Sequence, residues 1–309
     1  MTTTSPFLTD SLDILDRAKG ALLGLAVGDA LGATLEFSAR DTYPLHTEML
    51  GGGPFNLKPG QWTDDMAMAL ALADSLIMSG RLDPYDLMSR FVSWWQRGRY
   101  SSTGACFDIG LTTREALQRF TDTGNPFAGS TEEDTAGNGS LMRLAPVALF
   151  ALHDEEKALR IACDQSRTTH AASEAVEACE LLVTLLREAI LGRAEPLRNR
   201  AWIGHKAIRS IAAGSWRRKS RNEISSSGYV VSTLEAALWS VGQTSTFEDA
   251  LVLAINLGHD SDTVGAVAGQ LAGAIYGASA IPGRWLKPLA WRDQIEAFVP
   301  RLLASANEN

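Results

Sequence analysis

The stretch Gly20-Ala21-Leu22-Leu23-Gly24-Leu25-Ala26-Val27-Gly28-Asp29-Ala30-Leu31-Gly32 is built of small and apolar residues, with glycines four positions apart. Residues at this spacing share one face of an α-helix, so the glycines allow a second helix to approach closely. A glycine costs a helix up to ~1 kcal/mol relative to alanine, which packing or function must offset. Residues 264–276 repeat the pattern, with glycines at 265, 269 and 273. The sequence therefore predicts two tightly packed central helices, one from each end of the chain.

The remainder of the chain also reads as helical, because no stretch shows the alternation typical of a strand. We expect loops at 51–60, 99–110, 124–139 and 216–228, and no low-complexity linker. One all-α domain over residues 1–309 follows, with its core at about 18–305 and a flexible segment at 1–12. Helices are predicted over 18–35, 65–79, 84–97, 112–121, 141–153, 155–168, 174–191, 197–213, 233–241, 247–257, 264–276 and 291–304.

Composition narrows the class of protein. The 309 residues are 45% hydrophobic and 21% charged, which is typical of a soluble globular protein. The net charge of −8 does not favour binding to nucleic acid. Three cysteines without a C-x-x-C pair indicate a reducing compartment, and the first residues lack the features of a signal peptide. No apolar run is expected to reach the ~18–20 residues that span a membrane. The expected location is cytoplasmic, and the oligomeric state stays open.

Two acidic stretches, about 200 residues apart, have the same composition: Trp62-Thr63-Asp64-Asp65-Met66 and Gly258-His259-Asp260-Ser261-Asp262-Thr263. Each holds two carboxylates and a threonine just before an apolar helix. Plain capping of a helix start explains either one alone, with Thr63 as the N-cap of its helix. Four carboxylates cannot share a buried site without cations, however, and hard oxygen ligands suit Mg²⁺, Mn²⁺ or Ca²⁺. Together they predict a two-metal site. His259 is expected to pack or hydrogen-bond more readily than to bind metal.

The second stretch has another interpretation. Asp260-Ser261-Asp262-Thr263-Val264 also matches the D-x-D-x-T/V nucleophile motif of haloacid-dehalogenase-type phosphatases. That motif follows an N-terminal strand in a Rossmann-like domain, whereas here it is C-terminal and among helices. We keep this phosphatase function as a weaker alternative.

Five motifs in a fixed order carry a resemblance to a known family. They are the glycine-rich stretch 20–33, the Trp62 motif, Phe107-Asp108-Ile109-Gly110, Gly137-Asn138-Gly139-Ser140-Leu141-Met142-Arg143, and the Gly258 motif. The chain resembles the ADP-ribosylglycohydrolases, which include dinitrogenase-reductase-activating glycohydrolases and ADP-ribosylarginine and ADP-ribosylserine hydrolases. The resemblance implies a compact orthogonal helical bundle with two divalent metal ions, Mg²⁺ or Mn²⁺. The implied metal ligands are Thr63, Asp64, Asp65, Asp260, Asp262 and Thr263.

The resemblance also implies residues for catalysis and for substrate binding. Glu36 falls where the family has a glutamate in a mobile flap, and Glu36, Asp65 and Asp108 are the candidates for acid or base. Solvent-facing or capping roles are the alternatives for Glu36 and Asp108. The family often has asparagine where this chain has Leu111, which puts one substrate contact in doubt. The residues expected to bind substrate are Gly110, Gly137, Asn138, Gly139, Ser140, His170 and Tyr229.

Some of these residues have a physical rationale of their own. Gly137–Ser140 before a helix would form an anion cradle for a diphosphate, with Arg143 assisting or forming an ion pair; a simple glycine turn is the alternative. For His170 and Tyr229 it is the resemblance that implies a role: His170 would help to bind substrate and Tyr229 would stack near adenine or ribose. A surface histidine and an ordinary buried tyrosine are the alternatives.

The implied reaction is hydrolysis of the bond between the anomeric carbon of ADP-ribose and an acceptor, in which metals hold the ribose hydroxyls and orient a water. An arginine N-glycosidic bond is favoured and a serine O-glycosidic bond is the second choice. The partner would be an ADP-ribosylated protein or a small-molecule ADP-ribose conjugate. A catalytically silent ADP-ribose binder or crystallin-like relative is the alternative from another class. The sequence does not determine the acceptor.

Overall fold

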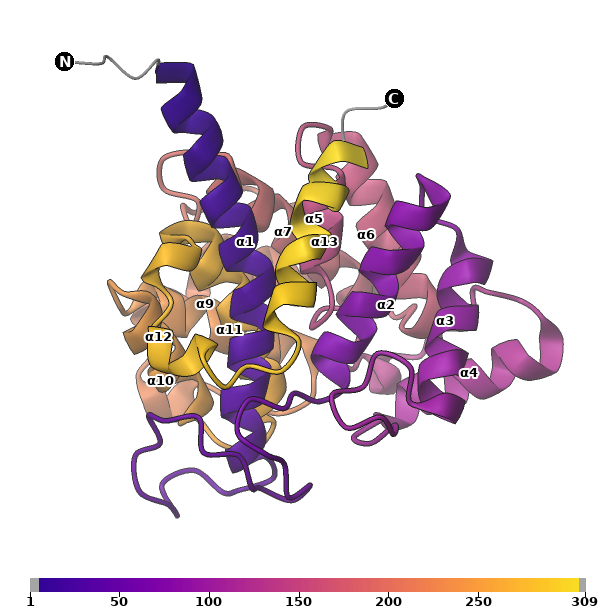
Figure 1. The fold of residues 1–309 in the computed structure, drawn as a ribbon, viewed down its shortest axis with the longest axis horizontal. Coiled ribbons are helices and arrows are strands. Elements are labelled where there is room, and N and C mark those ends of the chain that lie inside the picture. The colour runs from indigo at the N-terminus through magenta and orange to yellow at the C-terminus, as the bar shows by residue number, and fades with distance from the viewer. Residues whose placement is uncertain (1–5, 306–309) are drawn as a thin grey trace.

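A computed structural model describes the backbone of residues 6–305 and the side chains of residues 13–305. Within this part of the chain the regular structure is helical, and β pairing is limited to three isolated bridges. The all-α prediction is therefore confirmed. Figure 1 shows the helices α1 (Pro6–Gly32), α2 (Asp64–Ser79), α3 (Pro84–Arg97), α4 (Leu111–Thr123), α5 (Ala145–Phe150), α6 (Glu155–Thr169), α7 (Ser173–Ile190), α8 (Lys206–Ala212), α9 (Val230–Gly242), α10 (Phe247–Ile255), α11 (Ser261–Tyr276), α12 (Gly283–Leu286) and α13 (Arg292–Ser305).

The two glycine-patterned helices, α1 and α11, pack against each other at the centre of the molecule. A Cβ atom added to Gly24 would lie 2.1 Å from the carbonyl oxygen of Gly269, and one added to Gly28 would lie 2.0 Å from that of Gly265. No side chain fits in such a space, so the two backbones are in direct contact. The glycine pattern thus has a packing cause, as the sequence predicts.

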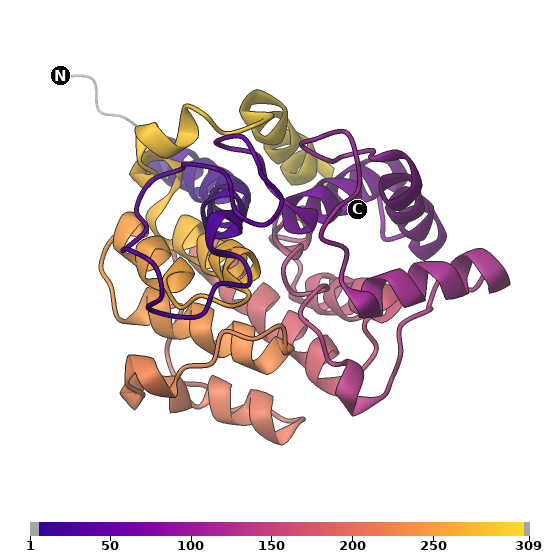
Figure 2. The ribbon, with the colours of Figure 1, turned by 90° about the horizontal axis from the view of Figure 1, so that it is seen from below.

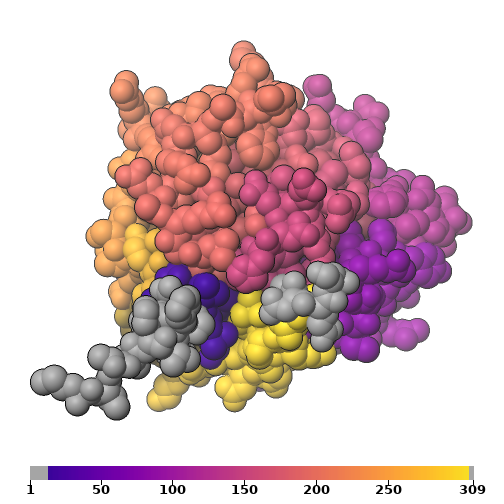
Figure 3. Space-filling model, turned by 90° about the horizontal axis from the view of Figure 1, so that it is seen from above, coloured from indigo at the N-terminus to yellow at the C-terminus, as the bar shows by residue number. Residues whose placement is uncertain are grey.

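The other helices surround this pair. α7, α9 and α10 pack against α11, while α2, α5 and α13 pack against α1, and α3, α4 and α6 extend the bundle beyond α2 (Figure 1). α13 reaches the surface between α1 and the α2–α3 segment, where its yellow atoms separate indigo from purple in Figure 3. The long loop after α1 crosses the face opposite to the one shown in Figure 3, and α1 ends at this face (Figure 2). That face carries the candidate site.

Two predicted helices are much shorter in the structure, and one helix was not predicted. The segment expected to be helical over 141–153 is reduced to α5, because residues 139–143 form turns and Pro146 lies in the first helical turn. The helix expected over 197–213 is reduced to α8, which begins only after Gly204, a residue with φ of 150°. The short helix α12 was not predicted.

Two expectations concern the N-terminal part. Of the segment expected to be flexible, residues 1–5 lie outside the described residues, and the backbone from Pro6 onward belongs to α1. The expectation that no apolar run could span a membrane needs correction, because Asp13–Leu35 is long and apolar enough by length and composition. Most of this segment is buried inside the molecule against α11, which accounts for its apolar character.

Replacing Gly28 by alanine is expected to destabilise the protein. Alanine favours a helix by up to ~1 kcal/mol over glycine, but overpacking a core costs ~1–3 kcal/mol, and here a methyl group would meet a rigid backbone carbonyl. The free energy of unfolding, measured by urea titration with circular dichroism, should fall. Gly283→Ala is the control, because its Cβ would meet nothing within 4 Å. Unchanged stability of the Gly28 variant would contradict the packing argument.

Candidate metal centre and substrate cleft

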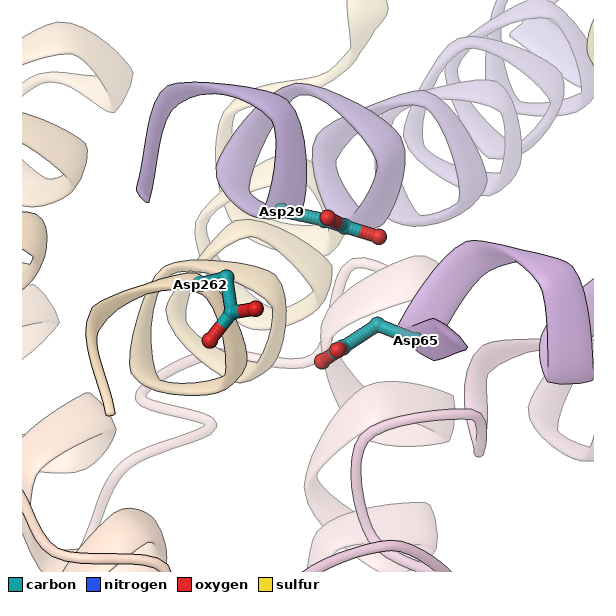
Figure 4. Close-up of side chains that lie close together, drawn as sticks. All are labelled: Asp29, Asp65 and Asp262. Carbon is teal, nitrogen blue, oxygen red and sulfur yellow. The ribbon is translucent and has the colours of Figure 1, made fainter. Parts of the chain in front are cut away.

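Carboxylates from three helices converge where α1 ends and where α2 and α11 begin. Asp29 of α1, Asp65 of α2 and Asp262 of α11 each place one oxygen within 4.8 Å of the other two (Figure 4). A second group with the same spacing consists of Glu36, Asp260 and Asp262. Asp262 belongs to both groups, so the two clusters are adjacent and share a carboxylate. Both acidic stretches therefore meet in the fold, as the sequence predicts.

Asp29 is the member of this cluster that the sequence reasoning missed. Its Oδ1 accepts hydrogen bonds from the backbone N–H and the hydroxyl of Thr63 (2.8 and 3.0 Å), and its Oδ2 accepts one from the N–H of Met66 (3.0 Å). These are the bonds with which an N-cap side chain satisfies a helix start. Asp29, fully buried on the neighbouring helix, therefore caps α2. The available signal was its charge, because Asp29 is the only charged residue in the apolar stretch 20–35.

The capping role expected for Thr63 is corrected accordingly. Thr63 occupies the N-cap position of α2, but its side chain makes no capping hydrogen bond. Its hydroxyl instead lies among carboxylates, 3.2 Å from Asp65 Oδ2 and 3.3 Å from Asp262 Oδ2. The hydroxyl is thus directed into the cluster.

Glu36 caps the start of α11, as Asp29 caps the start of α2. Its Oε2 accepts hydrogen bonds from the backbone N–H groups of Ser261 (2.9 Å) and Asp262 (3.4 Å), at the start of that helix. Positive partial charge at a helix start favours a carboxylate there. Glu36 is almost fully buried in this position.

The loop that carries Glu36 is held down by several contacts in this structure. The N–H of Phe37 donates to the carbonyl oxygen of His259 (2.7 Å), and the N–H of His259 donates to that of Ser38 (2.8 Å). The Arg40 guanidinium donates to three backbone carbonyls, those of residues 221, 224 and 257, at 2.6–2.9 Å. The loop expected to be a mobile flap is therefore docked here, and its movement stays a prediction.

Asp260, Asp64 and Thr263 complete the acidic part of the site. Asn138 Nδ2 donates to Asp260 Oδ2 (2.8 Å) and to the hydroxyl of Thr233 (2.9 Å), so Asn138 orients the carboxylate. Asp64 and Thr263 lie in the wall of the cleft but outside both carboxylate groups. His259 also lines the cleft and belongs to neither group.

Burial raises the pKa of most of these carboxylates. Burial, followed by the charge of Asp262, raises the pKa of Asp29 to about 8 and that of Asp260 to about 7. Burial and the charge of Asp64 raise the pKa of Asp108 to about 11. The pKa values of Asp64 and Asp65 are also raised, chiefly by burial. A cluster with these properties binds either protons or cations.

The donor set fits a divalent cation. Asp65 Oδ1 is buried and has no hydrogen-bond partner. An unpaired buried carboxylate oxygen costs free energy unless an ion or a proton satisfies it. Carboxylates and hydroxyls are the hard ligands preferred by Mg²⁺ and Mn²⁺. The residues present are therefore suited to hold metal.

A cleft of about 620 Å³ opens over this cluster. Of the predicted site residues, Asp65 and Thr63 lie behind the wall, whereas Glu36, Asp64, Asp108, Gly110, Asp260, Asp262 and Thr263 line the cleft. Three lining residues that are not glycine, Phe37, Asp108 and His259, have φ between 57° and 61°. Such left-handed backbone is costly for ordinary residues and tends to gather at functional sites.

The opposite wall consists of glycines packed on an imidazole. Gly137, Asn138, Gly139 and His170 all line the cleft. A Cβ on Gly139 would lie 2.7 Å from His170 Cε1, so only glycine allows this approach. The helix-start anion cradle expected here is corrected, because α5 begins only at Ala145 and turns follow Gly139.

The protonation of His170 is set by a buried network. Arg143, fully buried over the ring of Phe91, donates from Nη2 to the hydroxyl of Thr169 (2.9 Å). That hydroxyl lies 2.9 Å from His170 Nδ1 and has its own hydrogen left to donate. We infer that Nδ1 accepts this hydrogen and that the ring proton resides on Nε2. Burial and the charge of Arg143 lower the pKa of His170 to about 3.

Two predicted substrate-binding residues lie elsewhere. The hydroxyl of Ser140 is fully buried 2.8 Å from the hydroxyl of Ser166, away from the cleft. Tyr229 does not line the cleft; its hydroxyl donates to Glu174, although its backbone pairs with Gly137. Leu111, at the position of the departure from the family pattern, lines the cleft and is 70% exposed. No strand precedes Asp260 in the described residues, which removes the basis of the phosphatase alternative.

The structure is an all-α bundle with a cleft over a cluster of carboxylates, several of which lie at the starts of α2 and α11. This architecture agrees with the family that the five ordered motifs indicated. The chain belongs to the ADP-ribosylglycohydrolase family, whose model matches residues 10–309. It is thus an ADP-ribosyl hydrolase, an enzyme that cleaves a glycosidic bond, in a family that is in general metal-dependent.

Individual relatives agree with this assignment. The chain is 44% identical to the ADP-ribosylarginine hydrolase Tri1 of Serratia proteamaculans, over 99% of this chain and 84% of that protein. It is 38% identical to the ADP-ribosyl-[dinitrogen reductase] glycohydrolase of Rhodospirillum rubrum, over 94% and 97% of the two chains. A solved structure described as an ADP-ribosylglycohydrolase-related protein complex superposes with a TM-score of 0.83 at 45% identity, covering 96% of this chain and 99% of that one.

Mg²⁺ or Mn²⁺ is expected to raise the unfolding temperature, and more so at pH 8 than at pH 5. Asp29 and Asp260 have raised folded-state pKa values, about 8 and about 7. Above the unfolded value of 3.8 the folded apoprotein holds protons that the unfolded chain has lost, so its stability declines as pH rises through these values. Cations compete least with protons at high pH and relieve the repulsion there.

The measurement is differential scanning fluorimetry of chelator-treated protein, with NaCl matched for ionic strength as the control. Asp262→Asn should reduce the gain. An equal gain with NaCl, or no dependence on pH, would show that the carboxylates do not hold the cation.

His170 is expected to be neutral at pH 5 with its proton on Nε2, which imidazole ¹⁵N NMR can detect. Its folded pKa is depressed from 6.5, so its contribution to stability is present above pH 6.5 and is lost as pH falls towards 3. Thr169→Val removes the hydroxyl that fixes the tautomer, and the Nδ1–H form should appear. A doubly protonated His170 at pH 5 would overturn the network argument.

Proposed function

We propose that this protein removes ADP-ribose from arginine side chains of ADP-ribosylated proteins, using two divalent ions, Mg²⁺ or Mn²⁺. The observation that carries the proposal is the pair of carboxylate groups that share Asp262 at the base of the cleft. The relative in Serratia proteamaculans is named an ADP-ribosylarginine hydrolase, which favours the N-glycosidic bond over the serine O-glycosidic alternative.

The two groups suggest a division of ligands. Asp29, Asp65 and Asp262 would hold one ion with Thr63, and Glu36, Asp260 and Asp262 would hold the other with Thr263. Asp64, in the cleft wall, is a further ligand candidate. When bound, such ions supply positive charge that orients ribose hydroxyls and a water. Asp65 is fully enclosed, so we assign it to metal binding rather than to proton transfer.

The reaction requires one proton to move from water to the leaving nitrogen. Water adds its oxygen to the anomeric carbon, the carbon–nitrogen bond breaks, and the departing guanidine takes up the proton as guanidinium. Asp108 lines the cleft, where burial raises its pKa, and we assign it the transfer of a proton to that nitrogen. Glu36 is the second candidate, acting as base once it leaves its cap on α11.

The glycine wall is suited to the ADP-ribose part of the substrate. Gly137 and Gly139 leave the backbone open to close approach, and His170 directs an Nε2–H donor into the cleft. Gly110 and Asn138 line the same space. Ser140 and Tyr229 are further from it, so their roles depend on the family resemblance alone.

We also propose a cytoplasmic location. The three cysteines are free in the structure, which is typical of proteins in a reducing compartment.

Purified protein should release ADP-ribose from an ADP-ribosylarginine peptide only with Mg²⁺ or Mn²⁺. Asp64→Ala combined with Asp262→Ala should lower the rate at least ~100-fold, because ligand loss removes the ion, while the helical circular-dichroism signal persists. Product is measured by chromatography after chelation and re-addition of each metal.

An ADP-ribosylserine peptide and a small-molecule conjugate serve as comparison substrates. Full activity in excess chelator would exclude the metal role. Tight binding of ADP-ribose without turnover of any substrate would instead identify a silent binder, the alternative from a different functional class.

A further inference from the structure

We propose that the exposed ring of Phe37 binds the guanidinium of the modified arginine and thereby selects arginine over uncharged acceptors. This inference rests on the proposed function and adds the residue that recognises the acceptor. No metal ligand and no proton transfer is involved in it.

Folding stability does not explain where Phe37 lies. The residue follows Glu36 directly, its φ is 61°, and its side chain is 68% exposed while lining the cleft. Left-handed backbone costs a bulky residue ~1 kcal/mol or more, and an exposed ring recovers little of the burial energy that a phenylalanine gains in a core. The backbone pairing with His259 holds the residue in place despite this cost. A ligand for the ring is the simplest reason for the arrangement.

Phe37 is the outer member of a row of three rings. Its ring centroid lies 6.1 Å from that of Phe55 at an interplanar angle of 72°, and the Phe55 centroid lies 5.2 Å from that of Phe107. Phe55 and Phe107 are only partly exposed, so they support Phe37 from behind. The row joins the loop of Glu36 to the loop of Asp108, because Phe37 and Phe107 are their immediate sequence neighbours. The row of rings therefore lies beside Glu36 and Asp108, the two residues proposed to act on the bond to the acceptor.

The lining of the cleft is compatible with a cation at the exposed ring. No lysine or arginine of the described residues lines the cleft, so no cationic side chain competes with a guanidinium for the face of Phe37. A guanidinium over an aromatic face gains ~0.5–1 kcal/mol when exposed and ~2 kcal/mol when desolvated. That range corresponds to a two- to thirtyfold preference for arginine. A serine hydroxyl offers neither the charge nor the flat surface to stack.

The test compares Phe37→Leu and Phe37→Trp with the wild type on an ADP-ribosylarginine peptide. Leucine keeps an apolar side chain without a π face, so KM should rise two- to thirtyfold while kcat changes less than twofold. This pattern is expected because the cation is present in both the bound substrate and the transition state. Tryptophan, which binds cations best, should retain the wild-type KM. Phe127→Leu, at a 44% exposed phenylalanine outside the cleft, is the matched control.

A second readout is the affinity for free ADP-ribose, measured by calorimetry. It should change less than twofold in Phe37→Leu, because ADP-ribose lacks the guanidinium. A matching loss of ADP-ribose affinity would mean that the ring stacks on adenine, and a fall in kcat alone would mean that it only positions Glu36. Either result overturns the proposal, as does an unchanged KM. A wild-type protein that does not turn over the arginine substrate would refute the proposed function itself.

Discussion

The direct contact between the backbones of α1 and α11 is the constraint on which the rest of the structure depends. Each helix contributes a row of glycines, and an added Cβ on one would lie about 2 Å from a carbonyl oxygen of the other. Because the helices cannot slide or separate without losing this fit, the end of α1 and the start of α11 are fixed side by side. Asp29 and Asp262 are thereby brought to one point from opposite ends of the chain (Figure 4).

The carboxylates also organise the helices that present them. Asp29 caps α2 and Glu36 caps α11, and both come from α1 or the residues just after it. At each helix start, backbone N–H groups that have no partner within the helix therefore donate to a carboxylate that also belongs to the acidic cluster. The same side chains, Asp29 and Glu36, therefore stabilise the helix starts and contribute carboxylates that can bind a cation. Burial, and after it the charge of Asp262, raises the pKa values of Asp29 and Asp260 in this arrangement.

Much of this arrangement could be predicted from the sequence, for reasons visible in particular residues. Glycine spacing indicated the central helix pair, and two stretches of like composition indicated one metal site. What local patterns could not indicate were contacts made across the fold. The cap that Asp29 places on α2 and the relay from Arg143 through Thr169 both depend on neighbours that are distant in sequence. Ser140 lies in one of the five ordered motifs and Tyr229 outside them, and the side chains of both lie away from the cleft.

The pairing of α1 with α11 has a consequence for synthesis of the chain. The apolar glycine face of α1 emerges first from the ribosome, whereas its partner follows more than 200 residues later. Until then α1 lacks the surface that covers it, and the acidic cluster lacks Asp260 and Asp262. The complete acidic cluster can therefore form only after α11 has been synthesised. A truncated product would expose an apolar helix and would be unable to assemble the complete site.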